Sequence, residues 1–245
     1  MELDHEELKE KLLEWNNIHN NGKPILLLKF CKQREYVEDI KNGKLYLNTV
    51  EFFRNLEEKT GSKDKGDDLE CMFIDPETKK RTQVKDDEKV SLFSFFGINV
   101  DEIKIIDYKM KDNNIMTIFY RLPEEKLEEF IDIFGDNCIT IWTCEFEKKI
   151  SSFLKESEYH VGNCIYKEPT PEKIYEFIEG SPERFLYKTK TLAYQHEYRF
   201  IYLNKIPENH YLEIGEFEEK GIFDSKELLT ATHNIDVLLS QLKLN

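Results

Sequence analysis

Residues 194–203 have the sequence Tyr194-Gln195-His196-Glu197-Tyr198-Arg199-Phe200-Ile201-Tyr202-Leu203. Aromatic and β-branched residues dominate this stretch and alternate with polar ones, which predicts a β-strand. Because successive side chains on a strand point to opposite faces, the residues separate into two sets. One face carries His196, Tyr198, Phe200 and Tyr202, and the other carries Gln195, Glu197, Arg199 and Ile201. An amide, a carboxylate and a guanidinium are therefore neighbours on a strand whose other face is predicted to be buried.

The spacing of Gln195 and Glu197 suits a reaction on a nucleotide ribose. A carboxylate in such a site accepts a hydrogen bond from a ribose hydroxyl and stabilises an oxocarbenium-like centre, while its neighbour orients the acceptor. The alternative is structural. Glu197 then pairs with Arg199 on the same face, as an exposed ion pair worth less than about 1 kcal/mol. The pattern leaves both interpretations open.

Composition narrows the class of protein. A chain of 245 residues is long enough to bury a substantial core, and its 13% of aromatic residues argues against disorder. The sequence has no apolar run near the roughly 20 residues that span a bilayer. The start of the chain, residues 1–7, is acidic where a signal peptide is basic. We therefore expect a cytoplasmic protein with no membrane partner.

Charge and cysteine usage narrow the class of ligand. The formal net charge of −14 argues against general nucleic-acid binding, which needs clustered Lys and Arg. A local basic group can still hold a small nucleotide, since net charge and local field differ. The five cysteines form no Cys-x-x-Cys pair, so we expect reduced, mostly buried thiols and no zinc site.

The order of elements predicts a single α+β domain over residues 1–245, with a central mixed or antiparallel sheet flanked by helices. The expected helices cover residues 4–19, 33–41, 50–58, 123–133, 147–155, 171–179 and part of 225–244. The expected strands cover residues 25–31, 45–47, 90–96, 114–120, 138–146, 161–166, 194–203 and 211–214. Asn42-Gly43 marks a left-handed helix stop. Residues 25–203 form the expected core, between an N-terminal helix in 1–24 and a C-terminal extension over 204–245.

Other charged residues are candidates for ligand binding. Lys29 interrupts a strongly apolar strand, so it pairs with Glu197, holds a phosphate or ribose oxygen, or blunts an edge strand. Arg54 follows an aromatic pair and has the geometry to clamp a carboxylate or phosphate. The acids Asp67, Asp68 and Glu70 suit Mg²⁺ in a metal-dependent nuclease, but a solvated acidic loop explains them equally, and we expect no metal.

Several motifs together resemble a known family. They are Leu28-Lys29-Phe30-Cys31, Asn42-Gly43-Lys44-Leu45-Tyr46-Leu47-Asn48, Phe52-Phe53-Arg54-Asn55-Leu56-Glu57, Gly66-Asp67-Asp68-Leu69-Glu70, residues 134–141, the predicted strand at residues 162–166 and residues 194–199. In this order, over residues 25–203, they resemble the DUF2971 family of uncharacterised bacterial and phage proteins. The Phe-Asn-Asp-Pro pattern usual in that family is absent, which makes the chain similar to a divergent branch.

A looser resemblance is to the ADP-ribosyltransferase-like toxins, which close with a Gln-x-Glu or Glu-x-Glu strand. It implies an ADP-ribosyltransferase-like fold and NAD as the nucleotide, with Glu197 and Gln195 catalytic. It places Lys29 on the first strand, where that family usually has His or Arg, and Tyr46 or Thr49 on the second. The implied function is an NAD-using transferase or glycohydrolase of the phage-defence or toxin type.

In this hypothesis Lys29, Tyr46 and Arg54 hold the dinucleotide, and the acceptor is a small nucleotide, a protein or a nucleic acid. The acidic charge supports a competing hypothesis, a noncatalytic interaction module that docks a basic phage or host partner.

Overall fold

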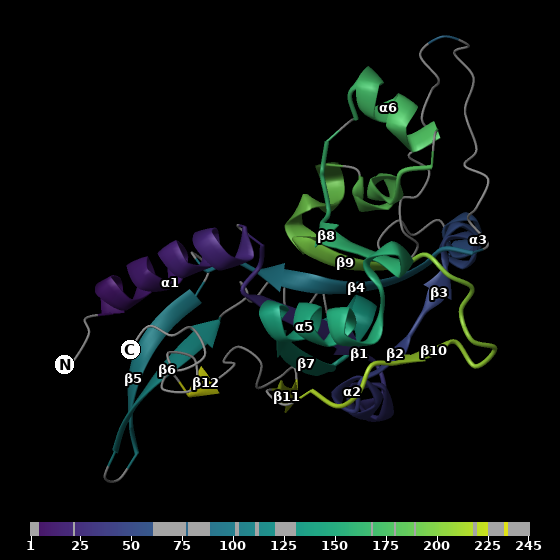
Figure 1. The fold of residues 1–245 in the computed structure, drawn as a ribbon. Coiled ribbons are helices and arrows are strands. Elements are labelled where there is room, and N and C mark those ends of the chain that lie inside the picture. The colour runs from purple at the N-terminus through teal and green to yellow at the C-terminus, as the bar shows by residue number, and fades with distance from the viewer. Residues whose placement is uncertain are drawn as a thin grey trace. The chain divides into compact units, whose positions relative to one another are not determined.

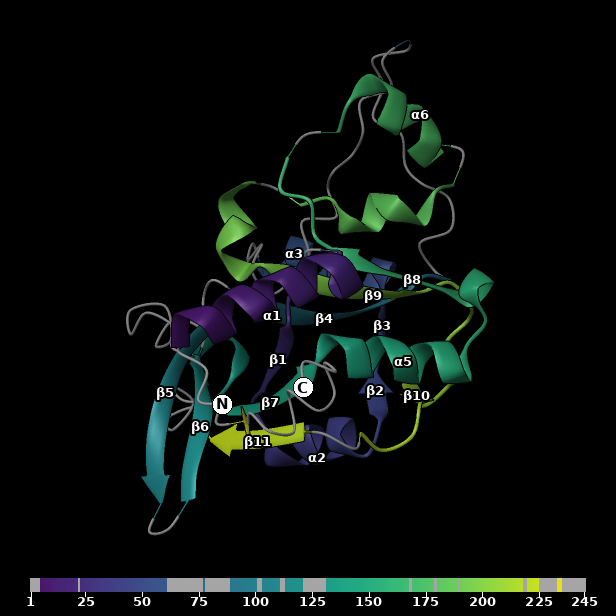
Figure 2. The ribbon, with the colours of Figure 1, turned by 60° about the vertical axis from the view of Figure 1, so that its left-hand side comes forward.

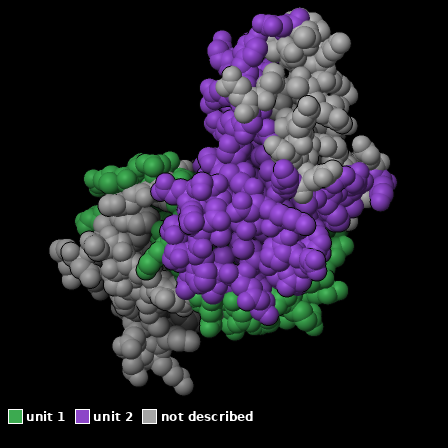
Figure 3. Space-filling view, turned by 45° about the vertical axis from the view of Figure 1, so that its right-hand side comes forward, with its two compact units in different colours: residues 1–42, 97–148, 216–245 green, residues 43–96, 149–215 purple. Residues whose placement is uncertain are grey.

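The computed structural model describes residues 5–21, 23–60, 77, 89–100, 103–110, 113–120, 131–167, 169–178, 180–188, 190–217, 220–224 and 233–234. It is α+β, with a mostly antiparallel sheet flanked by helices, as predicted (Figure 1). The chain forms two compact units (Figure 3). Unit 1 comprises residues 1–42, 97–148 and 216–245, and unit 2 comprises residues 43–96 and 149–215. The sequence-based division into 1–24, 25–203 and 204–245 stays a prediction.

Unit 1 combines helices with paired strands. Its elements are α1 (His5–Asn20), β1 (Leu26–Cys31), α2 (Arg34–Lys41), β5 (Ile103–Met110), β6 (Asn113–Tyr120), β7 (Asn137–Trp142), β11 (Lys220–Asp224), β12 (His233–Asn234) and the first half of α5 (Thr143–Phe153). Strand β7 pairs antiparallel with β1 on one side and β11 on the other. Strands β5 and β6 run side by side over eight residue pairs (Figure 2). The predicted helix over 4–19 and strand over 25–31 are confirmed.

Three predictions in unit 1 need correction. The predicted strand 138–146 ends at Trp142, because Thr143 begins α5 and its hydroxyl donates to Pro24 O. Strand β5 was not predicted, since Lys104, Asp107 and Lys109 interrupt its apolar pattern. Within the tail predicted to be helical, His233–Asn234 form a short strand on β6, and the rest of 225–244 lies outside the described residues. The predicted helix 123–133 is described only from residue 131.

Unit 2 holds a four-strand antiparallel ladder, β3-β4-β9-β8. Its elements are β2 (Lys44–Tyr46), β3 (Asn48–Thr49), α3 (Val50–Thr60), β4 (Ser91–Ile98, its last two residues in unit 1), the end of α5, η2 (Glu156–Glu158), β8 (Tyr159–Asn163), α6 (Pro171–Ile178), η3 (Pro182–Leu186), η4 (Lys190–Gln195), β9 (Glu197–Tyr202) and β10 (Tyr211–Glu213). Apolar side chains from α3, β4, η3, β9 and the residue before β4 pack together in one core cluster, namely Val50, Val90, Leu92, Phe185, Leu186 and Ile201.

The predicted strand over 194–203 is shorter than expected. Strand β9 begins at Glu197, because the 3₁₀ helix η4 extends to Gln195 and His196 has a left-handed backbone with φ of 42°. Residues 197–201 of β9 are all buried, and η3 with the residues that follow it contacts the side that carries Glu197, Arg199 and Ile201. His196 is exposed and lies outside the strand, so its predicted place on the apolar face is wrong.

The turn after α2 follows the predicted left-handed stop. Gly43 has φ of 73°, a conformation that side chains rarely adopt. A Cβ atom at Gly43 would overlap the backbone of Gly215, which has φ of 78° itself. Ile214 N–H donates to Gly43 O at 2.8 Å, so the two chain segments are in direct backbone contact. Glycine is therefore required here both for the turn and for the close approach.

Candidate functional site

Glu197 is the centre of a buried polar cluster in unit 2. Its side-chain atom Oε2 accepts a hydrogen bond from Lys188 Nζ at 2.6 Å. Its Oε1 accepts two from Arg199, from Nε at 3.0 Å and from Nη2 at 2.8 Å. Glu197 is 7% exposed, Lys188 4% and Arg199 0%. One carboxylate is therefore held between two cations almost out of contact with water.

Polar groups from neighbouring segments complete this arrangement. Lys188 Nζ also donates to Gln195 Oε1 at 2.9 Å. The Glu197 N–H donates to the hydroxyl of Tyr166 at 2.8 Å, and Arg199 Nη1 donates to Phe185 O. We call the five residues Tyr166, Lys188, Gln195, Glu197 and Arg199 the Glu197 cluster.

Strand pairing places the members of the cluster. On one side of β9, Glu197 is opposite Phe96 and Arg199 is opposite Ser94 of β4. On the other side Arg199 is opposite Gly162 of β8, and Glu197 O accepts from Cys164 N at 2.8 Å. Pairing with β4 on one side and bonding to Cys164 on the other therefore fix the position of the first residues of β9.

The segment that carries Lys188 is fixed by its own backbone bonds. Ile165 N donates to Leu186 O at 2.7 Å, and Lys188 N donates to Ile165 O at 3.0 Å. The parallel bridge between Ile165 and Tyr187 belongs to the same contact. Lys188 consequently approaches the carboxylate from a segment laid along the continuation of β8.

Electrostatics keep Glu197 ionised. Burial by itself would raise the pKa of Glu197. The charges of Arg199 and Lys188, with hydrogen bonds from Lys188 and Ser94, outweigh burial and hold that pKa well below its ordinary value of 4.5. Burial raises the pKa of Tyr166, and the nearby Cys164 and Glu197 raise it further, so its hydroxyl stays protonated. The cluster therefore contains a carboxylate anion beside a neutral phenol.

The structure brings the two predicted catalytic residues together, though not as neighbours on one strand. Gln195 ends η4 and Glu197 begins β9, yet both side chains bind the same Lys188 ammonium group. The Glu197–Arg199 ion pair of the structural interpretation is also present. It is buried rather than exposed, because the chain around η3 covers that face of β9.

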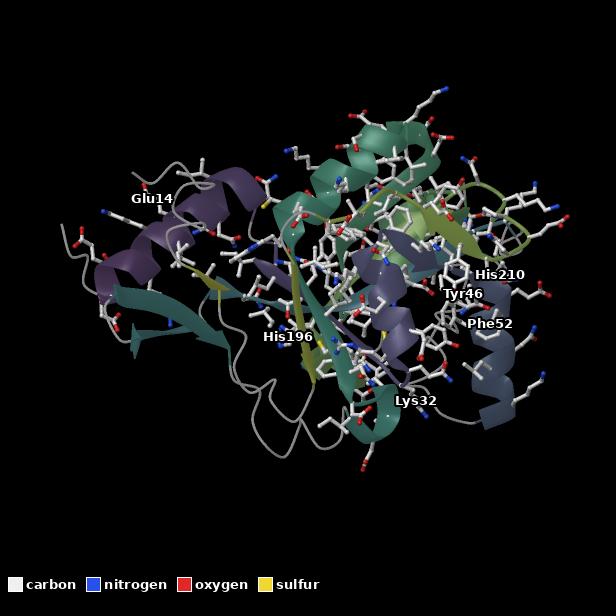
Figure 4. All side chains as sticks on the ribbon, turned by 90° about the horizontal axis from the view of Figure 1, so that it is seen from below. Glu14, Lys32, Tyr46, Phe52, His196 and His210 are labelled. Carbon is white, nitrogen blue, oxygen red and sulfur yellow. The ribbon has the colours of Figure 1, made fainter. Side chains whose placement is uncertain are left out.

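The predicted dinucleotide contacts of unit 2 belong to β2, β3 and α3, whereas the Glu197 cluster belongs to β9 and the segments beside it. Tyr46 on β2 is 44% exposed, and its ring stacks on His210 and meets Tyr211 edge-on, with ring centroids 5.6 Å and 5.2 Å away (Figure 4). Thr49 accepts a hydrogen bond from Phe52 N at 3.1 Å, which caps the start of α3. Arg54 lies on α3, and its side chain is outside the described residues.

Lys29 belongs to the other unit. It is half-buried on β1 of unit 1, whereas the Glu197 cluster and Tyr46 belong to unit 2. The ion partners of Glu197 in unit 2 are Lys188 and Arg199. Asp67, Asp68 and Glu70 lie outside the described residues.

Lys188 and Tyr166 were not predicted from the sequence to be part of the site. Neither has a periodic relation to Glu197, because 3₁₀ turns and irregular chain separate them from β9. The available signal was a lysine that directly follows the apolar run Phe185-Leu186-Tyr187, since a buried lysine requires a partner.

The described part of the chain also contains side chains of the types that hold metals, and free thiols. Its His, Cys, Asp and Glu side chains form no group of three or more placed to hold a metal ion. Of its four cysteines, Cys31, Cys138 and Cys164 are buried and Cys144 is exposed, all as free thiols. Burial raises the pKa of Cys31 and of Cys138, which keeps them protonated. Among the same residues, no helix combines the length and apolarity needed to cross a membrane.

Comparison with protein-family models, curated proteins and solved structures finds no match to this chain.

Proposed function

We propose that the Glu197 cluster is the active site of an NAD-using ADP-ribosyltransferase or glycohydrolase, in a protein of the phage-defence or toxin type. Glu197 would stabilise the oxocarbenium-like ribose as the nicotinamide bond breaks, and Gln195 would orient the acceptor. The proposal rests on one observation. Gln195 Oε1 and Glu197 Oε2 lie 2.9 Å and 2.6 Å from one nitrogen atom, Lys188 Nζ.

The energetics of the cluster favour a role beyond stability. Burying charged groups costs several kcal/mol per ion, and well-packed apolar residues often stabilise a fold about as well or better. Clusters of buried, perturbed ionisable groups are correspondingly common at functional sites. An ionised carboxylate is the form that this reaction needs, and Arg199 and Lys188 keep Glu197 in that form.

The carboxylate can take part only by exchanging a bond. A carboxylate offers about four lone-pair positions, and Lys188, Arg199 and Ser94 already donate to Glu197, so in this proposal a ribose hydroxyl replaces one of these donors. In this proposal the contacts to the dinucleotide within unit 2 are Tyr46, Thr49 and Arg54. The exposed ring of Tyr46 supports stacking on a heterocycle, which needs an accessible aromatic face.

The test compares NAD binding by calorimetry and NAD consumption by wild type, Glu197→Gln and Gln195→Ala. We expect wild type to consume NAD, Glu197→Gln to lose turnover, and Gln195→Ala to lose transfer to an acceptor more than hydrolysis. Glu147→Gln is the matched control, because Glu147 also bonds a lysine at 2.6 Å, in unit 1. If folded wild-type protein neither binds nor consumes NAD, with or without acceptors, the proposal is wrong.

A second candidate is the noncatalytic acidic interaction module. It is favoured by the near-complete burial of a carboxylate whose two oxygens already bond Lys188 and Arg199, an arrangement that also serves a purely structural role. The net charge of −14 suits a basic partner. In a pull-down from host lysate, this function predicts that Glu197→Gln keeps the captured partner and that added salt releases it.

A further inference from the structure

We infer that His196 is a positioning residue whose left-handed backbone brings Gln195 and Glu197 onto the ammonium group of Lys188. His196 has φ of 42°, and its side chain is exposed, whereas Gln195 and Glu197 on either side of it are buried. An effect of this backbone on catalysis rests on the proposed function. Its effect on the positions of Gln195 and Glu197 rests on their hydrogen bonds to Lys188 alone.

Only one residue is available to change the chain direction. The 3₁₀ helix η4 ends at Gln195, and the His196 N–H closes its last turn by donating to Ala193 O at 3.2 Å. Strand β9 begins at Glu197, whose own N–H is bonded to the Tyr166 hydroxyl. The switch from helical turn to extended strand therefore occurs entirely at His196.

The residue type at position 196 determines how readily the backbone adopts the left-handed conformation. Glycine adopts the left-handed region freely and Asn adopts it more readily than most residues, whereas a β-branched side chain is a genuine outlier there. If position 196 moved to a right-handed or extended conformation, Gln195 and Glu197 would no longer be held against the same nitrogen. The imidazole points to the surface, so we assign the positioning role to the backbone.

The experiment replaces His196 by Gly, Asn, Ala and Ile. The expected result is near wild-type NAD turnover for His196→Gly and His196→Asn, although both lack the imidazole. His196→Ile is expected to lower kcat by roughly 10- to 100-fold with little change in KM, the effect of a misplaced catalytic group. His196→Ala should fall between them, which preserves the comparison if the isoleucine variant does not fold.

A matched control separates local positioning from general strain. Asn21 is also exposed and left-handed, with φ of 50°, and directly follows α1. Asn21→Ile should therefore lose stability but retain turnover. Hydrogen exchange at the Glu197 amide gives a readout without catalysis, and it should quicken in His196→Ile and in neither His196→Gly nor Asn21→Ile.

Two results would overturn the inference. Loss of turnover in His196→Gly and His196→Asn as large as in His196→Ile would show that the imidazole itself is needed. Unchanged Glu197 amide exchange in folded His196→Ile would show that the backbone conformation does not position the cluster. If wild type has no NAD turnover, the proposed function fails while the exchange measurement still decides the positioning role.

Discussion

Replacement of Glu197 by glutamine tests the buried cluster most directly. The change removes the negative charge that receives hydrogen bonds from Lys188 at 2.6 Å, from Arg199 at 3.0 Å and 2.8 Å, and from Ser94. Each bond to a charged group contributes about 1.5–3 kcal/mol. The amide oxygen of glutamine can keep the bonds from either Arg199 or Lys188, but its NH₂ group then faces the other cation. Breaking one partner out of a buried ion pair costs about 3–5 kcal/mol, and we expect Glu197→Gln to fall in that range.

Glu147→Gln provides the comparison that isolates burial. Lys23 and Glu147 have the same N···O distance of 2.6 Å, but their side chains are 27% and 26% exposed, against 4% and 8% for Lys188 and Glu197. Exposed ion pairs contribute less than about 1 kcal/mol. Urea unfolding of both variants at pH 7 measures the two costs. Equal costs would refute the reasoning, because burial would then have no influence on the strength of the pair.

Three further outcomes follow from the same geometry. The folded-state pKa of Glu197 lies below its ordinary value of 4.5, so the stability that its ionised form contributes is complete above that value and is lost as pH falls below it. Between pH 7 and about pH 3, the free energy of unfolding in urea should therefore fall more steeply for wild type than for Glu197→Gln. Tyr166→Phe removes the acceptor of the Glu197 N–H and should cost about 1–3 kcal/mol, with faster amide exchange at Glu197. Gly43→Ala should lower the melting temperature more than Gly180→Ala, since a Cβ atom at Gly43 overlaps the Gly215 backbone and at Gly180 meets nothing within 4 Å, while both glycines have positive φ.

Local sequence patterns predicted most element positions in the described chain. The helix over His5–Asn20, the strand over Leu26–Cys31 and the stop at Asn42-Gly43 each have a signal within a few residues: an apolar stripe, a continuous apolar run and a turn dipeptide. At the end of β7, where the prediction failed, a tertiary contact determined where the strand ends. Thr143 begins a helix because its hydroxyl and amide bind Pro24 and Ile25, 119 and 118 residues earlier.

The candidate site too was predicted in part from local sequence and determined in part by tertiary contacts. The polar alternation around Glu197 identified the carboxylate, the amide of Gln195 and the guanidinium of Arg199 from sequence. The exposure of the Glu197–Arg199 pair was predicted wrongly, because alternation reports which side chains share a face and carries no information about what covers it. That cover comes from η3 and the residues that follow it.

The sequence by itself determined that β9 would carry Glu197 and Arg199 together, since period-two geometry depends only on neighbours along the strand. Tertiary structure alone decided that Lys188 and Tyr166 join them, because loops and 3₁₀ turns bring these residues to Glu197 with no repeating spacing. It also decided the ionisation of Glu197, since that depends on burial and on cations supplied by folding.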